Sequence, residues 1–135
     1  MADIPQPLVA IFEAKKAAMA ARPQEEQDKI KAVMMEIFMD ADKKAEMMAM
    51  QEATFKAADT NEDGELDLAE YVNYTNMTGK NFSAKMGTPL GSDKTAEELS
   101  AHWEAHKVSG KAGVTHADTV QVMDWNMQWA TANMM

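Results

Sequence analysis

The stretch DTNEDGELDLAE, residues 59–70, decides how the rest of the sequence is interpreted. Oxygen-bearing side chains recur in it at alternate positions, and a single glycine follows the third of them. This matches the twelve-residue pattern D-x-[DN]-x-[DN]-G-x5-E, in which alternate side chains turn toward a common centre. The predicted metal ligands, at loop positions 1, 3, 5, 7, 9 and 12, are Asp59, Asn61, Asp63, Glu65, Asp67 and Glu70.

Several positions in this stretch have distinct expected roles. Glu65 is expected to bind through its backbone carbonyl, Asp67 through a water or directly, and Glu70 through both carboxylate oxygens. Gly64 can take the backbone angles that a sharp turn requires, and Leu66 is the apolar residue expected to point into the core. Ligands made of oxygen alone suit a hard cation such as Ca²⁺ and do not suit zinc or copper.

With these residues the stretch resembles the calcium loop of the EF-hand calcium-binding superfamily, the calmodulin-like proteins. Phe55 precedes the first ligand by four residues, as in the entering helix of that family, and Leu68, Tyr71 and Val72 follow at helical spacing. The resemblance implies an all-α protein built from helix-loop-helix units that occur in pairs. It also implies one bound Ca²⁺, with Mg²⁺ as a competitor for the same ligands.

A partner loop is expected where VSGKAG (108–113) is followed by VTHAD (114–118). The family resemblance pairs Val114 with Leu66 in a short β-bridge between the two loops. It also matches Gly113 to the turn glycine and places Asp118 last, if one residue is deleted after the glycine. The two loops together then form one helical lobe.

This second loop is expected to have lost its ion. Ser109 and Lys111 stand where carboxylates are required, and a lysine opposes a divalent cation. We therefore divide the chain into an N-terminal helical region, residues 1–44, and an EF-hand pair, residues 45–135. The active loop of that pair is 59–70, and the pseudo-loop is at about 108–119.

The first half of the chain is expected to be helical. Residues 8–21 form a first helix that Arg22-Pro23 ends, because a residue before proline is pushed out of helical geometry. Its apolar side is formed by Leu8, Ile11, Phe12 and Met19. Proline and glycine are both absent between residues 23 and 64, which favours one long or gently bent helix over about 24–58. The alternative is a bend within residues 40–44 (DADKK), where polar residues gather.

After the metal loop, a helix is expected from about Asp67 to Met77, ending near Gly79, followed by a linker over residues 79–94. The sequence TAEE at 95–98 is a capping box that starts a helix ending near Lys107. The last helix, about 115–133, opens with a second box-like pair, Thr115 and Asp118. It has two apolar sides that are expected to complete the core or to dock a partner. One side carries Val122, Trp125 and Trp129, and the other carries Val120, Met123 and Met127.

Composition limits the classes of function. The 135 residues carry a net charge of −9 with a pI near 4.7, which opposes binding to nucleic acid. The sequence has no cysteine, no signal-peptide pattern at its N-terminus and no apolar run long enough to span a membrane. We therefore expect an intracellular, cytoplasmic protein with no membrane span and no nucleic-acid partner.

The 14 methionines allow two interpretations. Methionine fills irregular helical cores, and it is also frequent on surfaces that adapt to different partners. The methionines between residues 34 and 50 are too crowded to share one stripe, so some are expected to face solvent or a partner. They are Met34, Met35, Met39, Met47, Met48 and Met50.

The sequence contains few alternatives to calcium chemistry. His102 and His106 lie four residues apart, a spacing that can hold zinc, but no third ligand is evident and two ordinary histidines are the favoured reading. No pattern singles out a nucleophile or a phosphate loop, so an enzyme is not expected. We expect a calcium-responsive sensor or adaptor that binds an amphipathic or basic partner helix through its Met- and Trp-rich surface. The alternative is a constitutive structural subunit of a larger assembly, with Ca²⁺ as a stabilising ion.

Overall fold

The computed structural model describes residues 4–87 and 94–133, and the described part is mainly helical. Its helices are α1 (Gln6–Ala20), α2 (Gln24–Met39), α3 (Ala41–Ala58), α4 (Leu68–Met86), α5 (Ala96–His106) and α6 (His116–Asn133). Two short strands, β1 (Glu65–Leu66) and β2 (Val114–Thr115), are the only strands in this part of the chain. The predicted all-α class is confirmed. Within the described ranges, no helix is both long and apolar enough to cross a membrane.

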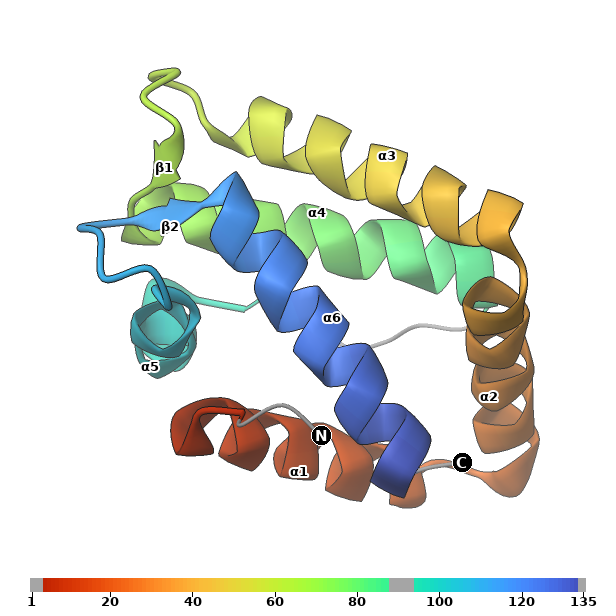
Figure 1. The fold of residues 1–135 in the computed structure, drawn as a ribbon. Coiled ribbons are helices and arrows are strands. Elements are labelled where there is room, and N and C mark those ends of the chain that lie inside the picture. Colours follow the sequence, from red (N-terminus) through yellow and green to blue (C-terminus); the bar gives the residue numbers. More distant parts are fainter. Residues whose placement is uncertain (1–3, 88–93, 134–135) are drawn as a thin grey trace.

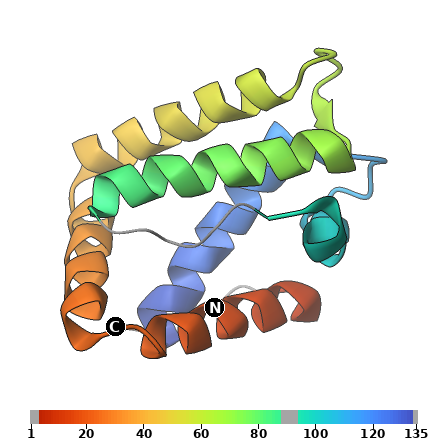
Figure 2. The same ribbon diagram turned by 180° about the vertical axis from the view of Figure 1, so that it is seen from behind.

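The helices are arranged around the paired strands (Figures 1 and 2). α3 and α4 lie side by side and antiparallel, joined by the loop that contains β1. α6 starts at β2 and runs away from the strands, while α5 is seen end-on beside them. α1 lies across the far end of α6, and α2 connects α1 to the start of α3 (Figure 1).

The two strands pair antiparallel in the predicted register. Leu66 lies opposite Val114 and Glu65 lies opposite Thr115, and both apolar residues are fully buried. The backbones approach so closely that a Cβ on Gly113 would lie 2.6 Å from the carbonyl oxygen of Leu66. The strand pair therefore joins the two loops and requires glycine at residue 113.

α2 and α3 are separate helices, so the prediction of one long helix over 24–58 is wrong and the alternative, a bend within residues 40–44, is confirmed. Asp40 leaves helical geometry (φ −114°, ψ 113°), and its Oδ1 accepts hydrogen bonds from the backbone N–H groups of Asp42 and Lys43. An aspartate that caps a new helix offers the backbone an alternative to continuing the old one. The break also shifts the buried side of the helix. Continued at helical spacing from the buried Ile37 of α2, that side would include Ala41 and Ala45, but both are exposed and Met47 is buried instead.

α4 is longer than the sequence indicated. It continues through Gly79 to Met86 and ends at Gly87, which adopts the left-handed conformation (φ 68°). The predicted end near Gly79 is therefore wrong, and residues 80–86 of the predicted linker are helical, while residues 88–93 lie outside the described residues. A glycine inside a helix costs only about 1 kcal/mol, which tertiary contacts can offset. One such contact is the hydrogen bond from Asn81 Nδ2 to Thr54 Oγ1 of α3 (3.1 Å).

Two glycine substitutions are expected to change stability in opposite directions. Gly79→Ala should stabilise the fold by about 0.5–1 kcal/mol, because alanine is the better helix former and nothing lies within 4 Å of the added carbon. Gly113→Ala should destabilise it by about 2 kcal/mol, because the added carbon meets backbone that must move. Urea midpoints of the two variants test this, and a Gly113→Ala protein as stable as Gly79→Ala would contradict the strand geometry.

The buried apolar residues form two separate clusters. The first, around the two loops, contains Phe55, Ala58, Leu66, Tyr71, Leu99 and Val114. The second, between α1 and α6, contains Leu8, Ile11, Phe12, Val122 and Trp129. The first cluster holds the loop of residues 59–70 in position, and the second holds α1 against the rest of the molecule.

A buried polar network links α3, α4 and α6. Gln51 of α3 is 7% exposed, and its Nε2 donates to the hydroxyl of Tyr74 (3.1 Å) and to the hydroxyl of Thr119. Its Oε1 lies 3.0 Å from His116 Nε2, and the His116 ring packs edge-on against Phe55. Buried polar groups are costly unless all are paired, so this network fixes the helices in one arrangement.

The methionines divide between core and surface. Met47 is 4% exposed, whereas Met35 and Met39 of α2 are 48% and 81% exposed. The expectation that some of the crowded methionines face outward is confirmed.

Candidate metal centre

Three of the predicted ligands come together at the end of α3 and the start of α4. One carboxylate oxygen from each of Asp59, Asp63 and Glu70 lies within 4.8 Å of the others. Asp59 follows the last residue of α3, Asp63 lies in the loop and Glu70 is in the first turn of α4. Among the described residues this is the one cluster of three or more such side chains that could hold a metal ion.

Asp59 carries the clearest sign that the cluster lacks a positive partner within the protein. The residue is 8% exposed, and its Oδ2 accepts a hydrogen bond from Gly64 N (2.9 Å). Its Oδ1 is buried and has no hydrogen-bond partner in the protein. A buried carboxylate oxygen left unpaired is strongly unfavourable, and two neighbouring carboxylates increase the cost. A hard cation bound by all three would remove this penalty, so the residues present fit Ca²⁺.

Glu70 is held inside the loop. It is 5% exposed, and its Oε2 accepts hydrogen bonds from the backbone N (2.9 Å) and the hydroxyl (3.2 Å) of Thr60. Its Oε1 accepts from Asp67 N (3.0 Å). The carboxylate that should close the site is thus positioned beside Asp59 and Asp63 by the loop itself.

The other predicted ligands contact the loop backbone. Asn61 Oδ1 accepts a long hydrogen bond from Asp63 N (3.4 Å). Asp67 Oδ1 accepts from Glu70 N (2.8 Å) and so forms a capping box with Glu70 at the start of α4. The Glu65 side chain is directed to the second loop, where its Oε1 accepts from Gly113 N (2.9 Å). That contact leaves the Glu65 carbonyl as the group available for the role predicted at position 7.

The loop backbone turns at two residues that have left-handed backbone angles. Gly64 has φ 82°, as its predicted role at the sharp turn requires, and Glu62 has φ 54°. Glycine adopts such angles without strain, and a non-glycine residue adopts them at a cost. These turns direct the N–H of Gly64 at Asp59 and that of Glu65 at Asp63 Oδ1 (3.0 Å).

The second loop has the same length as the first, so the predicted deletion after Gly113 is wrong. Asp59 follows α3 and lies seven residues before Leu66, and Lys107 follows α5 and lies seven residues before Val114. The loop therefore covers residues 107–118 without a gap. The sequence suggested a deletion because the glycine comes one residue later than in the first loop. The strand pairing, not the glycine, sets the alignment.

In this alignment Lys107 takes the place of Asp59, the first ligand. Its Nζ forms an ion pair with Glu104 (3.0 Å) and lies 3.9 Å from the centroid of the Trp103 ring. Ser109 and Lys111 occupy positions 3 and 5, where the first loop has Asn61 and Asp63. Two lysines at ligand positions oppose a divalent cation by direct repulsion.

Hydrogen bonds within the protein close the second loop. Asp118 is 2% exposed, and it accepts from Ser109 N (3.0 Å), Ser109 Oγ (3.1 Å) and Thr115 N (3.0 Å). Its own N donates to Thr115 Oγ1 (3.1 Å), which completes the capping box predicted for these two residues. The carboxylate at the end of this loop is satisfied by donors, whereas Asp59 in the first loop keeps an unpaired oxygen.

The pair His102 and His106 is part of the helix packing. His106 Nδ1 donates to the carbonyl oxygen of His102 (2.7 Å), and its ring lies 5.4 Å from that of Tyr71. Burial lowers the pKa of His106 to about 4, and it also lowers the pKa of His102. No third metal-binding side chain joins them among the described residues.

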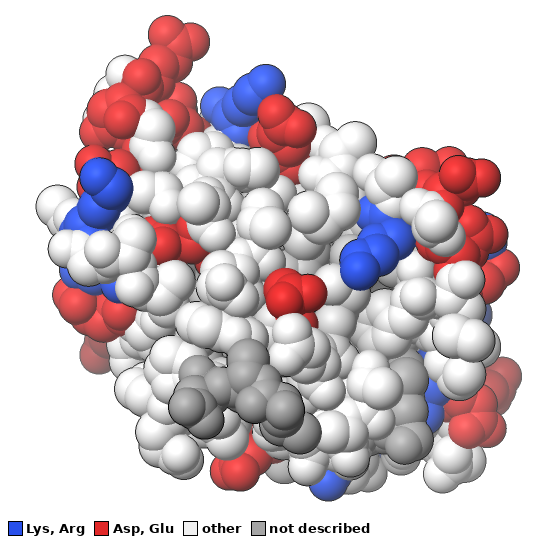
Figure 3. Space-filling view, viewed as in Figure 1, with Lys and Arg blue, Asp and Glu red and all other residues white. Residues whose placement is uncertain are grey.

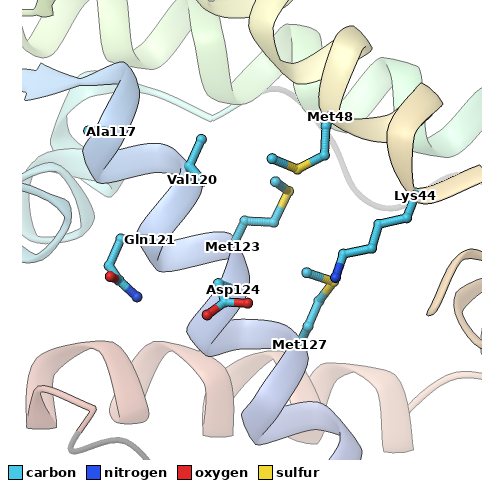
Figure 4. A pocket seen from close by; sticks show the side chains of 8 residues that line it. All are labelled: Lys44, Met48, Ala117, Val120, Gln121, Met123, Asp124 and Met127. Atoms are coloured by element: carbon cyan, nitrogen blue, oxygen red, sulfur yellow. The ribbon is translucent and has the colours of Figure 1, made fainter. Parts of the chain in front are cut away.

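A groove between α3 and α6 was not located from the sequence. It has a volume of about 430 Å³, and in Figure 4 Met48 and Met123 point into it from facing helices. It is lined by Lys44, Met48, Ala117, Val120, Gln121, Met123, Asp124 and Met127. This face of the molecule is mainly uncharged, whereas acidic side chains gather at the corner occupied by the 59–70 loop (Figure 3). The side of α6 with Val120, Met123 and Met127 thus lines the groove, and the side with Val122, Trp125 and Trp129 completes the second cluster.

Searches with this chain against protein-family models, curated proteins and solved structures each found no match.

Proposed function

We propose that this chain is a calcium-binding protein of the EF-hand type, calmodulin-like, with one Ca²⁺ in the loop formed by residues 59–70. The observation that carries the proposal is the buried, unpaired Oδ1 of Asp59 beside the carboxylates of Asp63 and Glu70. An all-oxygen site with three carboxylates attracts a hard divalent cation and offers no soft ligand.

In this proposal the predicted ligands of the 59–70 loop bind the ion in different ways. Asp59, Asp63 and Glu70 hold the ion through their carboxylates, and Asn61 and the Glu65 carbonyl complete the shell. Asp67 caps α4 and reaches the ion through water or directly. Mg²⁺ competes for the same ligands but prefers a smaller octahedral shell, so its binding is weaker where Glu70 contributes two oxygens.

The partner role is assigned to the methionine-lined groove between α3 and α6. Flexible thioether side chains adapt to the shape of an incoming helix, and the groove has an apolar floor with one cation and one anion, Lys44 and Asp124, in its lining. The chain as a whole carries a net charge of −9, which favours a basic amphipathic helix over an acidic one. In the sensor form of the proposal, Ca²⁺ shifts α4 relative to α3 and alters this groove.

A second candidate is a constitutive structural subunit in which Ca²⁺ is a stabilising ion. The observation that favours it is Glu70, which the loop hydrogen bonds already hold beside Asp59 and Asp63. Because Glu70 already lies beside the other two carboxylates, Ca²⁺ can bind without a movement of α4. The two candidates therefore differ in whether Ca²⁺ changes the exposed apolar surface.

Dye and peptide binding separate the two candidates. A sensor should bind 8-anilinonaphthalene sulfonate more strongly in Ca²⁺, and should bind a Lys/Leu amphipathic helical peptide about tenfold or more tightly in Ca²⁺ than in chelator. Met123→Gln should weaken the peptide because it places an amide in the groove, while the exposed Met39→Gln serves as the matched control. Equal peptide affinity with and without Ca²⁺ contradicts the sensor form, and no loss in Met123→Gln contradicts the groove.

A further inference from the structure

The second apolar cluster depends on α1 for three of its five buried members. Leu8 and Phe12 of α1 are 0% and 1% exposed, and the Phe12 ring lies 5.9 Å from that of Trp129. α5 and α6 supply the opposite surface, with Val122 and Trp129 buried and Trp125 packed against them. Without α1 these large side chains of α6 would face solvent.

The position of α1 follows from the different shapes of the two helix-loop-helix units. α3 and α4 lie antiparallel and side by side, whereas α5 is seen end-on and α6 runs across the view (Figures 1 and 2). Helices that diverge in this way leave an apolar face between them. α1 lies across that face and contacts both α5 and α6.

α1 is attached to this face by apolar contacts. In the part of the chain that the structure describes, no side-chain hydrogen bond or ion pair joins α1 to α5 or α6. Pro5 at its start provides no side-chain cap, and no charged residue in its first or last turn complements the helix dipole. The polar contacts at its end, from Gln27 Nε2 to the carbonyls of Ala20 and Arg22, tie it to the adjoining α2. Such a helix is stabilised by the surface it lies on and can leave it without breaking a polar network.

We propose that α1 is an intramolecular ligand of the α5–α6 face, and that this face binds an amphipathic helix of a partner protein when α1 leaves. The residues of α1 that contact the α5–α6 face indicate what kind of partner helix would fit there. The partner's helix carries large apolar side chains at the spacing of Leu8, Ile11 and Phe12 in α1. The acidic net charge of the chain favours neutral or basic residues on the other side of that helix. This proposal concerns a different surface from the methionine-lined groove and does not depend on calcium binding.

A peptide with the sequence of residues 4–21 tests the exchange. In the wild-type chain the tethered α1 competes at a high effective concentration, on the order of millimolar. Phe12→Ala in the full chain weakens that competitor, so the labelled peptide should bind this variant about tenfold or more tightly than the wild type, by fluorescence anisotropy. Glu13→Ala, the neighbouring exposed position, is the matched control and should bind like the wild type. A peptide that carries Phe12→Ala should not bind.

Hydrogen exchange on the unaltered chain tests the same proposal without a variant. The amides of α1 should exchange at least about tenfold faster than those of α6, because α1 opens while α6 stays folded. Equal protection of α1 and α6 would overturn the proposal. So would a folded Phe12→Ala chain whose affinity for the wild-type peptide does not exceed that of Glu13→Ala.

Discussion

At a free Ca²⁺ concentration one hundred times the dissociation constant, the thermal midpoint of the chain is expected to rise by about 8–11 °C. A ligand that binds only the folded state at this concentration contributes about 2.7 kcal/mol. For a domain of this size, each kcal/mol moves the midpoint by roughly 3–4 °C. Glu70→Gln should remove most of the rise, because it replaces the one carboxylate expected to give two oxygens to the ion.

The matched control for this variant is Glu62→Gln. It makes the same change of charge in the same loop, at an exposed position that supplies no predicted ligand. Differential scanning calorimetry in Ca²⁺ and in chelator should show a near wild-type rise for Glu62→Gln and almost none for Glu70→Gln. Equal responses of the two variants would mean that net loop charge, not ligation, produces the effect.

The free energy of unfolding is expected to fall by about 3 kcal/mol between pH 7 and pH 4 through His106 alone. Burial lowers the pKa of this histidine from 6.5 to about 4, so the folded state holds it neutral where the unfolded chain binds a proton. The contribution is complete above pH 6.5 and is lost as the pH falls toward the folded pKa. A difference of about 2.5 pKa units corresponds to roughly 3 kcal/mol.

His106→Leu isolates this contribution. Leucine keeps an apolar side chain against Tyr71 and cannot be protonated. Between pH 6 and pH 5 the urea-derived free energy of the wild type should fall by about 1.2 kcal/mol more than that of the variant. Identical slopes in this interval would show that His106 titrates alike in the folded and unfolded chains.

Local sequence patterns predicted the elements whose cause is local. The capping boxes at Thr95 and Thr115 depend on residues three apart, and both form. The pairing of Leu66 with Val114, which the structure shows, was expected from the family resemblance and not from a local pattern. The two sides of α6 also follow from helical spacing, which does not depend on what covers each side.

Features set by competition between elements were not predicted. The absence of proline and glycine favoured one long helix over the bend that residues 40–44 also suggested, because capping by Asp40 competes with helix continuation by a small free energy. Gly79 stays helical because contacts from elsewhere in the fold outweigh its low propensity. The burial of Gln51 likewise depends on Tyr74, Thr119 and His116, which lie far away in the sequence. The position of α1 on the α5–α6 face depends on tertiary contacts, which the residues of α1 alone do not specify.

At the candidate metal centre, the sequence identified the three carboxylates that come together. It did not reveal the unpaired oxygen of Asp59 or the hydrogen bonds that hold Glu70, because both depend on the folded loop. Its error about a deletion in the second loop came from aligning a glycine, whereas the strand register fixes Lys107 at the first position.

An isothermal calorimetric titration with Ca²⁺ of the wild type, Glu70→Gln and Glu62→Gln tests the central claim most directly. We predict one binding site in the wild type and in Glu62→Gln, and an affinity lower by about a hundredfold or more in Glu70→Gln. Absence of Ca²⁺ binding in the wild-type chain, or binding that Glu70→Gln leaves unchanged, would contradict the assignment of a calcium site to this loop.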